Sequence, residues 1–233
     1  MKVHFTVDVE HDCPPYLSTW RGIEEGLPPL LSMLDEERVR ATFFTTGCVA
    51  RRYPREVRAV VDAGHELASH GDTHTSFAAM TPDEAEREIA ESSAVLRTFG
   101  TVASFRAPYL QFPRERLPLL RRHGYTLDSS QGRHKSVSAR VHIEENVLRV
   151  PASVTSSTLR WPAVIRDALF GRLSDPVVLF VHPWEFVDFR RSSLRFDCRF
   201  RTGAAALDCA RSTLRFFAGR GAEFALMRDC VGR

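Results

Sequence analysis

Two histidines and two acids in the sequence have the types and spacings that suit a catalytic metal ion. His70 and His74 lie four positions apart, so on one helical turn their imidazoles face the same side and can bind one ion. Asp8 and Glu10 lie two positions apart, which puts both carboxylates on one side of a strand. Such a pair is unfavourable unless a cation or a shared proton compensates it. One acid with two histidines is a common ligand set of a hydrolytic metal, and the second acid is then free to act as a base.

Short apolar runs that alternate with helical patterns position these residues. Val3–Val7 predicts a strand directly before Asp8, and Glu66–Ser69 predicts one directly before His70. Five strands that each end in a reactive side chain favour a barrel, because the strand ends of a barrel ring one mouth. In an open sheet, only the strands beside the switch point would contribute. Three further polar side chains follow predicted strands in the same way: Arg106 after Val102–Phe105, Asp128 after Tyr125–Leu127 and His182 after Val177–Val181.

The remaining elements complete an α/β pattern with a parallel sheet. Thr81-Pro82-Asp83-Glu84 combines a capping box with proline at the first helical position, and it predicts a helix that runs to about Thr98. No repeat or linker interrupts the chain, so we expect one domain over residues 1–233. Other predicted elements are strands at Ala41–Phe44 and Ala222–Met227, and helices at Leu27–Arg38, Pro54–Ala63 and Gly203–Ala218.

The composition is that of a globular protein, with 43% hydrophobic and 26% charged residues. The 32 basic residues, all arginine except Lys2 and Lys135, are interspersed with 29 acidic ones, so nucleic acid is not an expected partner. The first residues lack the apolar region of a secretory signal, and the five cysteines lack paired spacing. Both observations favour a cytoplasmic location, with peripheral contact to a membrane surface as an alternative.

Six motifs follow one another in an order that resembles the polysaccharide deacetylase family, also called the NodB homology or carbohydrate esterase 4 family. The resemblance spans about residues 3–190. It implies a distorted (β/α)7 TIM-like barrel and a metal-dependent hydrolase that removes an N- or O-acyl group from a sugar. The motifs are Asp8-Val9-Glu10, Ala41-Thr42-Phe43-Phe44, the His70 and His74 pair, Arg106-Ala107-Pro108-Tyr109, Asp128-Ser129-Ser130 and Leu179-Phe180-Val181-His182-Pro183-Trp184.

The resemblance also implies roles for single residues. Trp184, next to His182, is in addition a candidate surface on which a sugar ring stacks. The metal is expected to be Zn²⁺, although Co²⁺, Ni²⁺ and Mn²⁺ accept the same ligands. The implied roles are Asp8 as general base, Glu10, His70 and His74 as metal ligands, Arg106 as the partner that keeps Asp8 ionised, His182 as general acid, Asp128 as its orienting partner and Tyr109 as a backbone donor to the oxyanion.

The first motif departs from the family pattern, in which most members carry two adjacent aspartates. Here a spacer separates Asp8 from Glu10, and His11 and Asp12 are rivals of Glu10 for the ligand role. This form, together with the segment from Trp20 to Gly26, resembles the branch that includes the deformylase of lipid-linked aminoarabinose.

The leading prediction is a metal-dependent deacetylase, or deformylase, that cleaves the linear amide of an N-acylated amino sugar. Two basic stretches, residues 133–142 and 190–201, are either solvated loops or walls that favour a phosphate-linked or lipid-linked substrate. One alternative is an allantoinase-like hydrolase of a small amide or ureide. The other is an inactive barrel that only binds carbohydrate. The sequence does not predict the oligomeric state.

Overall fold

The computed structural model describes residues 1–136 and 139–231, and these form two compact units. The first unit comprises Met1–Ala41 and Val154–Ala225, and the second comprises Thr42–Ser153 with the residues from Leu226 onward. Of the predicted domain over residues 1–233, positions 137–138 and 232–233 lie outside the described residues, as does the middle of the basic stretch 133–142. The extent of the domain stays a prediction.

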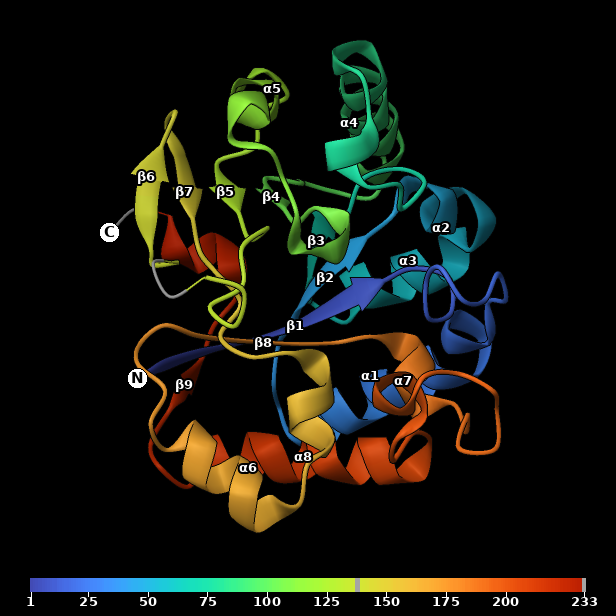
Figure 1. The fold of residues 1–233 in the computed structure, drawn as a ribbon, viewed down its shortest axis with the longest axis vertical. Coiled ribbons are helices and arrows are strands. Elements are labelled where there is room, and N and C mark those ends of the chain that lie inside the picture. The colour runs from blue at the N-terminus through green and yellow to red at the C-terminus, as the bar shows by residue number, and fades with distance from the viewer. Residues whose placement is uncertain (137–138, 232–233) are drawn as a thin grey trace. The chain divides into compact units, whose positions relative to one another are not determined.

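The first unit is built around a buried strand, β1 (Lys2–Val9), whose parallel neighbour β8 (Val177–Val181) is seen beside it in Figure 1. The register pairs Val7 with Val181, so both strands end at the same level. A short strand, β9 (Glu223–Phe224), also pairs with β1 in parallel and falls within the longer strand predicted there. The helices of this unit are η1 (Gly22–Gly26), α1 (Leu27–Glu36), η5 (Ser156–Arg160), α6 (Ala163–Phe170), η6 (Pro183–Phe186), α7 (Phe196–Arg199) and α8 (Ala204–Ala218).

The second unit contains a sheet with the strand order β6-β7-β5-β4-β3-β2. All its pairings are parallel except the one between β6 and β7. Its strands are β2 (Thr42–Thr45), β3 (Glu66–Ser69), β4 (Ser104–Phe105), β5 (Leu127–Asp128), β6 (His142–Glu144) and β7 (Val147–Arg149). Its helices are α2 (Gly47–Arg52), α3 (Pro54–Asp62), η2 (Phe77–Ala79), α4 (Pro82–Leu96), η3 (Pro108–Leu110), η4 (Arg114–Arg116), α5 (Leu117–Arg122) and η7 (Met227–Cys230).

Local sequence signals explain why several of these elements form. The predicted capping box is present at α4, where the Thr81 side chain accepts from the backbone of Glu84 and the Glu84 carboxylate accepts from the backbone of Thr81. The β6–β7 hairpin was not predicted. Its strand β6 has no buried alternating pattern, and its turn residues Glu145 and Asn146 both adopt positive φ, as a two-residue hairpin turn requires.

In the described part of the chain, no helix is both long and apolar enough to cross a membrane.

Candidate active site

In the first unit, the ends of β1 and β8 bring together an acid pair and a histidine. Asp8 and Glu10 are buried, and the shared register places His182 at the level of Asp8. His182 Nε2 lies 3.7 Å from Glu10 Oε1. The first unit therefore gathers the predicted base, the predicted carboxylate ligand and the predicted acid at one pair of strand ends.

The other ring nitrogen of His182 is held by Glu185, a residue that the sequence analysis did not select. His182 Nδ1 lies 2.8 Å from Glu185 Oε1. Glu185 Oε2 in turn forms an ion pair of 2.8 Å with Arg160 Nε, and both side chains are buried. Burial acts to raise the pKa of Glu185, but the charges of Arg160 and His182 outweigh it and hold the pKa below its usual range. An ionised carboxylate can only accept, so Nδ1 carries the proton that His182 donates to Glu185.

Three carboxylates set the charge state of His182. Burial lowers the pKa of this imidazole, but Glu10, Glu185 and Asp8 outweigh burial and raise the pKa to about 9. At neutral pH the ring is therefore cationic and can donate a proton from Nε2. This protonation state suits a general acid.

Trp184 packs against His182 and is itself buried. Its ring is stacked on the imidazole, with centroids 4.9 Å apart, and its Nε1 donates to Glu10 Oε1 over 3.4 Å. Only 6% of Trp184 is exposed, so the predicted sugar-stacking surface is replaced by a packing role. The indole fixes the imidazole and the carboxylate instead.

The hydrogen bonds of Asp12 distinguish it from Glu10 as a candidate carboxylate ligand of the metal ion. Its Oδ2 accepts from Thr19 Oγ1 at 2.6 Å and from the backbone of Arg21 at 2.9 Å, and its Oδ1 accepts from the backbone of Gly22 at 2.7 Å. Both oxygens are therefore occupied at the start of η1. Glu10 is the acid that the structure leaves as a candidate ligand, whereas Asp12 shapes the segment that follows β1.

In the second unit, His70 and His74 lie on an irregular turn after β3. The ring centroids are 5.2 Å apart. The expected helical turn is wrong, because Gly71 and His74 have φ of 75° and 64° and interrupt helical geometry. His70 Nδ1 donates to the backbone carbonyl of Arg106 at 2.8 Å, so Nε2 keeps its lone pair for a metal ion.

The shape of this turn comes from α4 and α2. Glu88 of α4 accepts from the backbone N–H of Asp72 at 2.8 Å and from that of Thr73 at 2.7 Å. The Asp72 carboxylate accepts from Arg51 of α2 at 2.8 Å. A side chain at Gly47 would place Cβ 1.9 Å from Asp72 Oδ1, so the close approach of α2 requires glycine. Glu88, Asp72 and Arg51 were missed because nothing in their local sequence marks these long-range contacts.

Arg106 and Tyr109 follow β4 in the same unit. Arg106 is fully buried over the ring of Phe44, 4.1 Å from its centroid, and donates from Nη2 to Ser129 Oγ at 3.0 Å. Tyr109 has φ of 60°, a strained conformation for a residue with a side chain, and its ring lies 4.8 Å from the His74 ring. The pairing of Arg106 with Asp8 and the oxyanion role of Tyr109 stay predictions.

Asp128 is buried at the end of β5, and its contacts differ from those predicted. Its Oδ2 accepts from Arg149 Nε at 2.9 Å, and its Oδ1 accepts from the backbone and hydroxyl of Ser130. Burial raises the pKa of Asp128, although Arg149 and Ser130 act to lower it. We expected Asp128 to orient His182, but Glu185 occupies Nδ1 of that ring. The reason is local, since Glu185 stands three positions after His182 on η6.

Acids within or just before the second basic stretch, residues 190–201, pair with its arginines. Arg190 pairs with Asp188 at 2.6 Å, and Arg195 pairs with Asp197 at 3.2 Å, with all four side chains largely exposed. Such exposed pairs are those of a solvated loop. Whether this loop contacts a substrate stays a prediction.

The residues present fit a divalent metal ion by their chemistry. Glu10, His70 and His74 are all buried and offer one carboxylate oxygen and two imidazole nitrogens, a set that can hold such an ion. The carbonyl that fixes the tautomer of His70 is the kind of support that metal-binding histidines receive.

The sequence matches a known family over its first half. Residues 3–127, more than half of the chain, match the family model of polysaccharide deacetylase. A peptidoglycan deacetylase of Helicobacter pylori is 31% identical over 124 residues, which cover 51% of this chain and 42% of that protein. A chitooligosaccharide deacetylase of Sinorhizobium fredii is 38% identical over 85 residues, which cover 35% of this chain and 40% of that protein. The chain thus spans less than half the length of these two relatives.

The fold is shared with solved structures. The family 4 carbohydrate esterase from Streptomyces lividans in complex with acetate superposes with a TM-score of 0.67 at 20% identity, covering 100% of this chain and 95% of that one. This likeness confirms the predicted α/β fold of the NodB homology type. Because the sequence match also includes Asp8, Glu10, the His70 and His74 pair and Arg106, the chain belongs to the polysaccharide deacetylase family.

Proposed function

We propose that the chain is a metal-dependent hydrolase that removes the N-acetyl group from an amino sugar. The observation that carries the proposal is the donor set of Glu10, His70 and His74, together with a histidine acid, His182, supported by its own carboxylate. The matched relatives are named for peptidoglycan and chitooligosaccharides. Their names support saccharides that contain N-acetylglucosamine as the first substrates to test.

Each of these residues has a task in amide hydrolysis. Glu10, His70 and His74 would hold a divalent ion, which when bound acts as a Lewis acid towards the amide carbonyl and lowers the pKa of water. Asp8 would take the proton from the attacking water, and buried Arg106 would be its charged partner. The backbone N–H of Tyr109 would donate to the oxygen on which negative charge develops.

His182 would complete the reaction. Its Nε2 proton passes to the nitrogen of the departing amine, since an amide nitrogen leaves only after it is protonated. Glu185 and Arg160 keep the imidazole in the tautomer and orientation that this transfer needs. The charge of Glu185, which acts to raise the pKa of His182, supports the same role.

The test combines metal content with product identity. We expect the zinc-reloaded wild type to hold about one equivalent of metal and to release acetate from chitooligosaccharides or peptidoglycan fragments. The His70→Ala/His74→Ala variant should hold little metal and release none. His123→Ala, which removes a histidine bound to Glu86 elsewhere in the second unit, is the matched control.

Other products would redirect the proposal. Formate in place of acetate would indicate the deformylase branch and a lipid-linked or phosphate-linked sugar. Ammonia from a ureide would support the allantoinase-like alternative. Metal-free wild-type protein that releases no acid from any of these compounds would overturn the hydrolase and favour the carbohydrate-binding alternative.

A further inference from the structure

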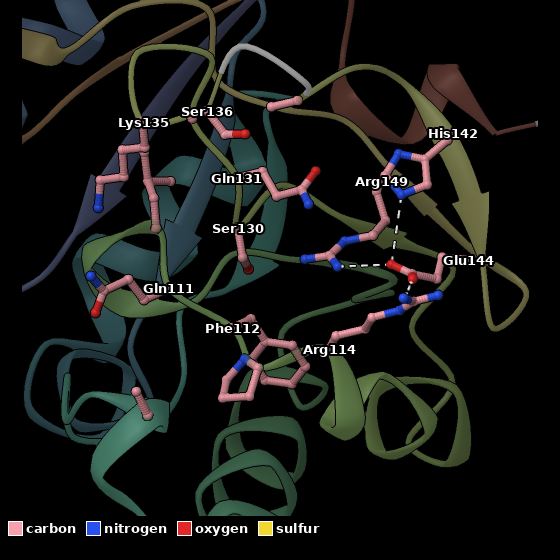
Figure 2. Close-up of a pocket in the computed structure, with 15 residues that line it drawn as sticks. Gln111, Phe112, Arg114, Ser130, Gln131, Lys135, Ser136, His142, Glu144 and Arg149 are labelled. Carbon is pink, nitrogen blue, oxygen red and sulfur yellow. Dashed lines mark hydrogen bonds and ion pairs between the residues drawn. The ribbon is translucent and has the colours of Figure 1, made fainter.

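The second unit contains a cavity of about 760 Å³ that none of the roles above uses. Figure 2 shows it between the turn that holds Gln111 and Phe112, the segment from Ser130 to Ser136 and the β6–β7 hairpin. A cavity of this size accommodates one or two sugar rings. Its lining therefore indicates what kind of sugar residue it would take.

Two polar groups at the cavity can bind a ligand. Gln131 Oε1 is buried and has no hydrogen-bond partner in the described part of the chain. Arg149 uses Nε for Asp128 and Nη1 for Glu144, at 2.9 and 3.0 Å. Its remaining nitrogen, Nη2, is directed into the cavity on the side of Ser130 (Figure 2). Buried polar groups are normally satisfied, so the unpartnered oxygen of Gln131 indicates a ligand hydroxyl, and the arginine nitrogen that faces the cavity suits an anionic group.

The charge of the lining is positive. Glu144 is paired with both Arg114 and Arg149, and Asp128 is paired with Arg149. Lys135 donates to the backbone carbonyl of Tyr109 and has no carboxylate partner among the described residues. The three cations Arg114, Arg149 and Lys135 therefore exceed the two acids Glu144 and Asp128 by one positive charge, which a ligand can neutralise.

The remaining wall is apolar and adjoins the histidine pair. Leu110, Phe112 and Pro113 supply a surface of the kind that packs against the C–H face of a sugar ring. Lys135 binds the carbonyl of Tyr109, whose ring packs against that of His74. A ligand in the cavity therefore lies beside the second unit's part of the active site.

We propose that this cavity is a subsite for a sugar residue that carries a carboxylate, next to the residue that is deacetylated. Gln131 Oε1 accepts from a sugar hydroxyl, and Arg149 Nη2 and Lys135 bind the carboxylate. The position of this sugar beside the deacetylated residue rests on the proposed function, whereas the binding of an acidic sugar does not. This subsite would select acidic saccharides over neutral chitooligosaccharides.

Two disaccharides that differ in one substituent test the subsite by direct binding. The first joins N-acetylglucosamine to N-acetylmuramic acid, which bears a carboxylate on an ether side chain. The second is N,N′-diacetylchitobiose, which has no carboxylate. In a titration followed by NMR, we expect the acidic disaccharide to bind at least about tenfold more tightly and to shift the side-chain amide signal of Gln131.

Two variants locate the effect within the cavity. Gln131→Leu removes the unpartnered oxygen at nearly constant volume, so it should weaken binding of the acidic disaccharide about tenfold while leaving the melting temperature unchanged or raised. Lys135→Ala should weaken binding of the same disaccharide and leave binding of N,N′-diacetylchitobiose unaffected. Arg121→Ala, which removes an exposed cation outside the cavity on α5, should change neither.

The outcomes separate this inference from the proposed function. Equal binding of the two disaccharides would overturn the carboxylate preference, and binding of neither would overturn the subsite. Acetate release without carboxylate-dependent binding would contradict only this inference. Carboxylate-dependent binding without acetate release would support the subsite and contradict only the proposed function.

Discussion

Glu185 binds His182 Nδ1 at 2.8 Å, and its second oxygen faces Arg160 at the same distance, so one buried carboxylate joins a histidine to an arginine. Arg160 is itself fixed, because it donates from Nη2 to the backbone carbonyl of Asp197 at 2.7 Å. All of these contacts lie within the first unit. A charged carboxylate in this position also stabilises the imidazolium.

Replacing Glu185 tests whether it positions the acid. We expect Glu185→Gln to lower kcat about 10- to 100-fold with little change in KM, because the amide can accept from Nδ1 but cannot stabilise the imidazolium. Metal content should be unchanged. Asp128→Asn, whose side chain contacts Arg149 and Ser130, is the comparison variant. If Asp128→Asn moved the acidic and basic limits of the pH–rate profile while Glu185→Gln did not, the positioning role would belong to Asp128 after all.

The same carboxylate makes stability depend on acid pH. The pKa of Glu185 in the folded protein lies below the ordinary value of 4.5, because Arg160 and His182 favour the charged form over the effect of burial. A lowered pKa contributes stability that is fully present above about pH 4.5 and is lost as the pH falls through the folded-state value. Urea unfolding between pH 7 and pH 3 should therefore show a steeper acid loss for wild type than for Glu185→Gln. Parallel curves for the two proteins would contradict this assignment.

Metal binding should stabilise the folded state. Because an ion bound only by the folded protein adds stability, chelation should lower the melting temperature of the wild type. The His70→Ala/His74→Ala variant should melt at a temperature that the chelator does not change, and His123→Ala should respond as the wild type does. A chelator effect of the same size in the double variant would place the ion elsewhere.

Much of the fold and part of the site could be predicted because short-range patterns determine them. The capping residues Thr81 and Glu84 act within one turn, and the polar residues that follow apolar strands can be recognised along the chain. The role of Glu185 depends on Arg160, which lies 25 positions earlier in the sequence. Nothing in the residues around Arg160 indicates this pairing. The exclusion of Asp12 likewise depends on a turn that returns Thr19 and Gly22 to its side chain.

The histidine turn was mispredicted for a related reason. A spacing of four positions is compatible with a helix, but Glu88 binds the backbone N–H groups of Asp72 and Thr73 and stabilises a tighter path. Spacing alone cannot reveal an acceptor that comes from another helix. The two imidazoles still converge, because the turn as a whole is short.

Glu88 therefore offers a test of how the turn supports the metal. Glu88→Ala leaves the buried backbone donor of Asp72 and the partly buried one of Thr73 without their acceptor, and we expect it to destabilise the protein by about 1–3 kcal/mol and to weaken metal affinity. Glu91→Ala, on the exposed face of the same helix, should change both quantities little. Urea unfolding and a competitive metal titration measure the two effects. A destabilised Glu88→Ala protein with unchanged metal affinity would show that the turn does not position the histidines.

Gly22 controls the approach of η1 to the segment that carries Glu185. A side chain at Gly22 would place Cβ 2.6 Å from the backbone nitrogen of Trp184 and 2.8 Å from Asp12 Oδ1, and backbone cannot give way as a flexible side chain can. Gly22→Ala should therefore lower the free energy of unfolding by about 1–3 kcal/mol and lower kcat, since η6 must shift and take Glu185 with it. Gly100→Ala, where a Cβ meets nothing within 4 Å, should be neutral or slightly stabilising. If the two alanine variants unfolded at the same urea concentration and turned over equally, close packing at Gly22 would have no part in holding His182 and Glu185 in place.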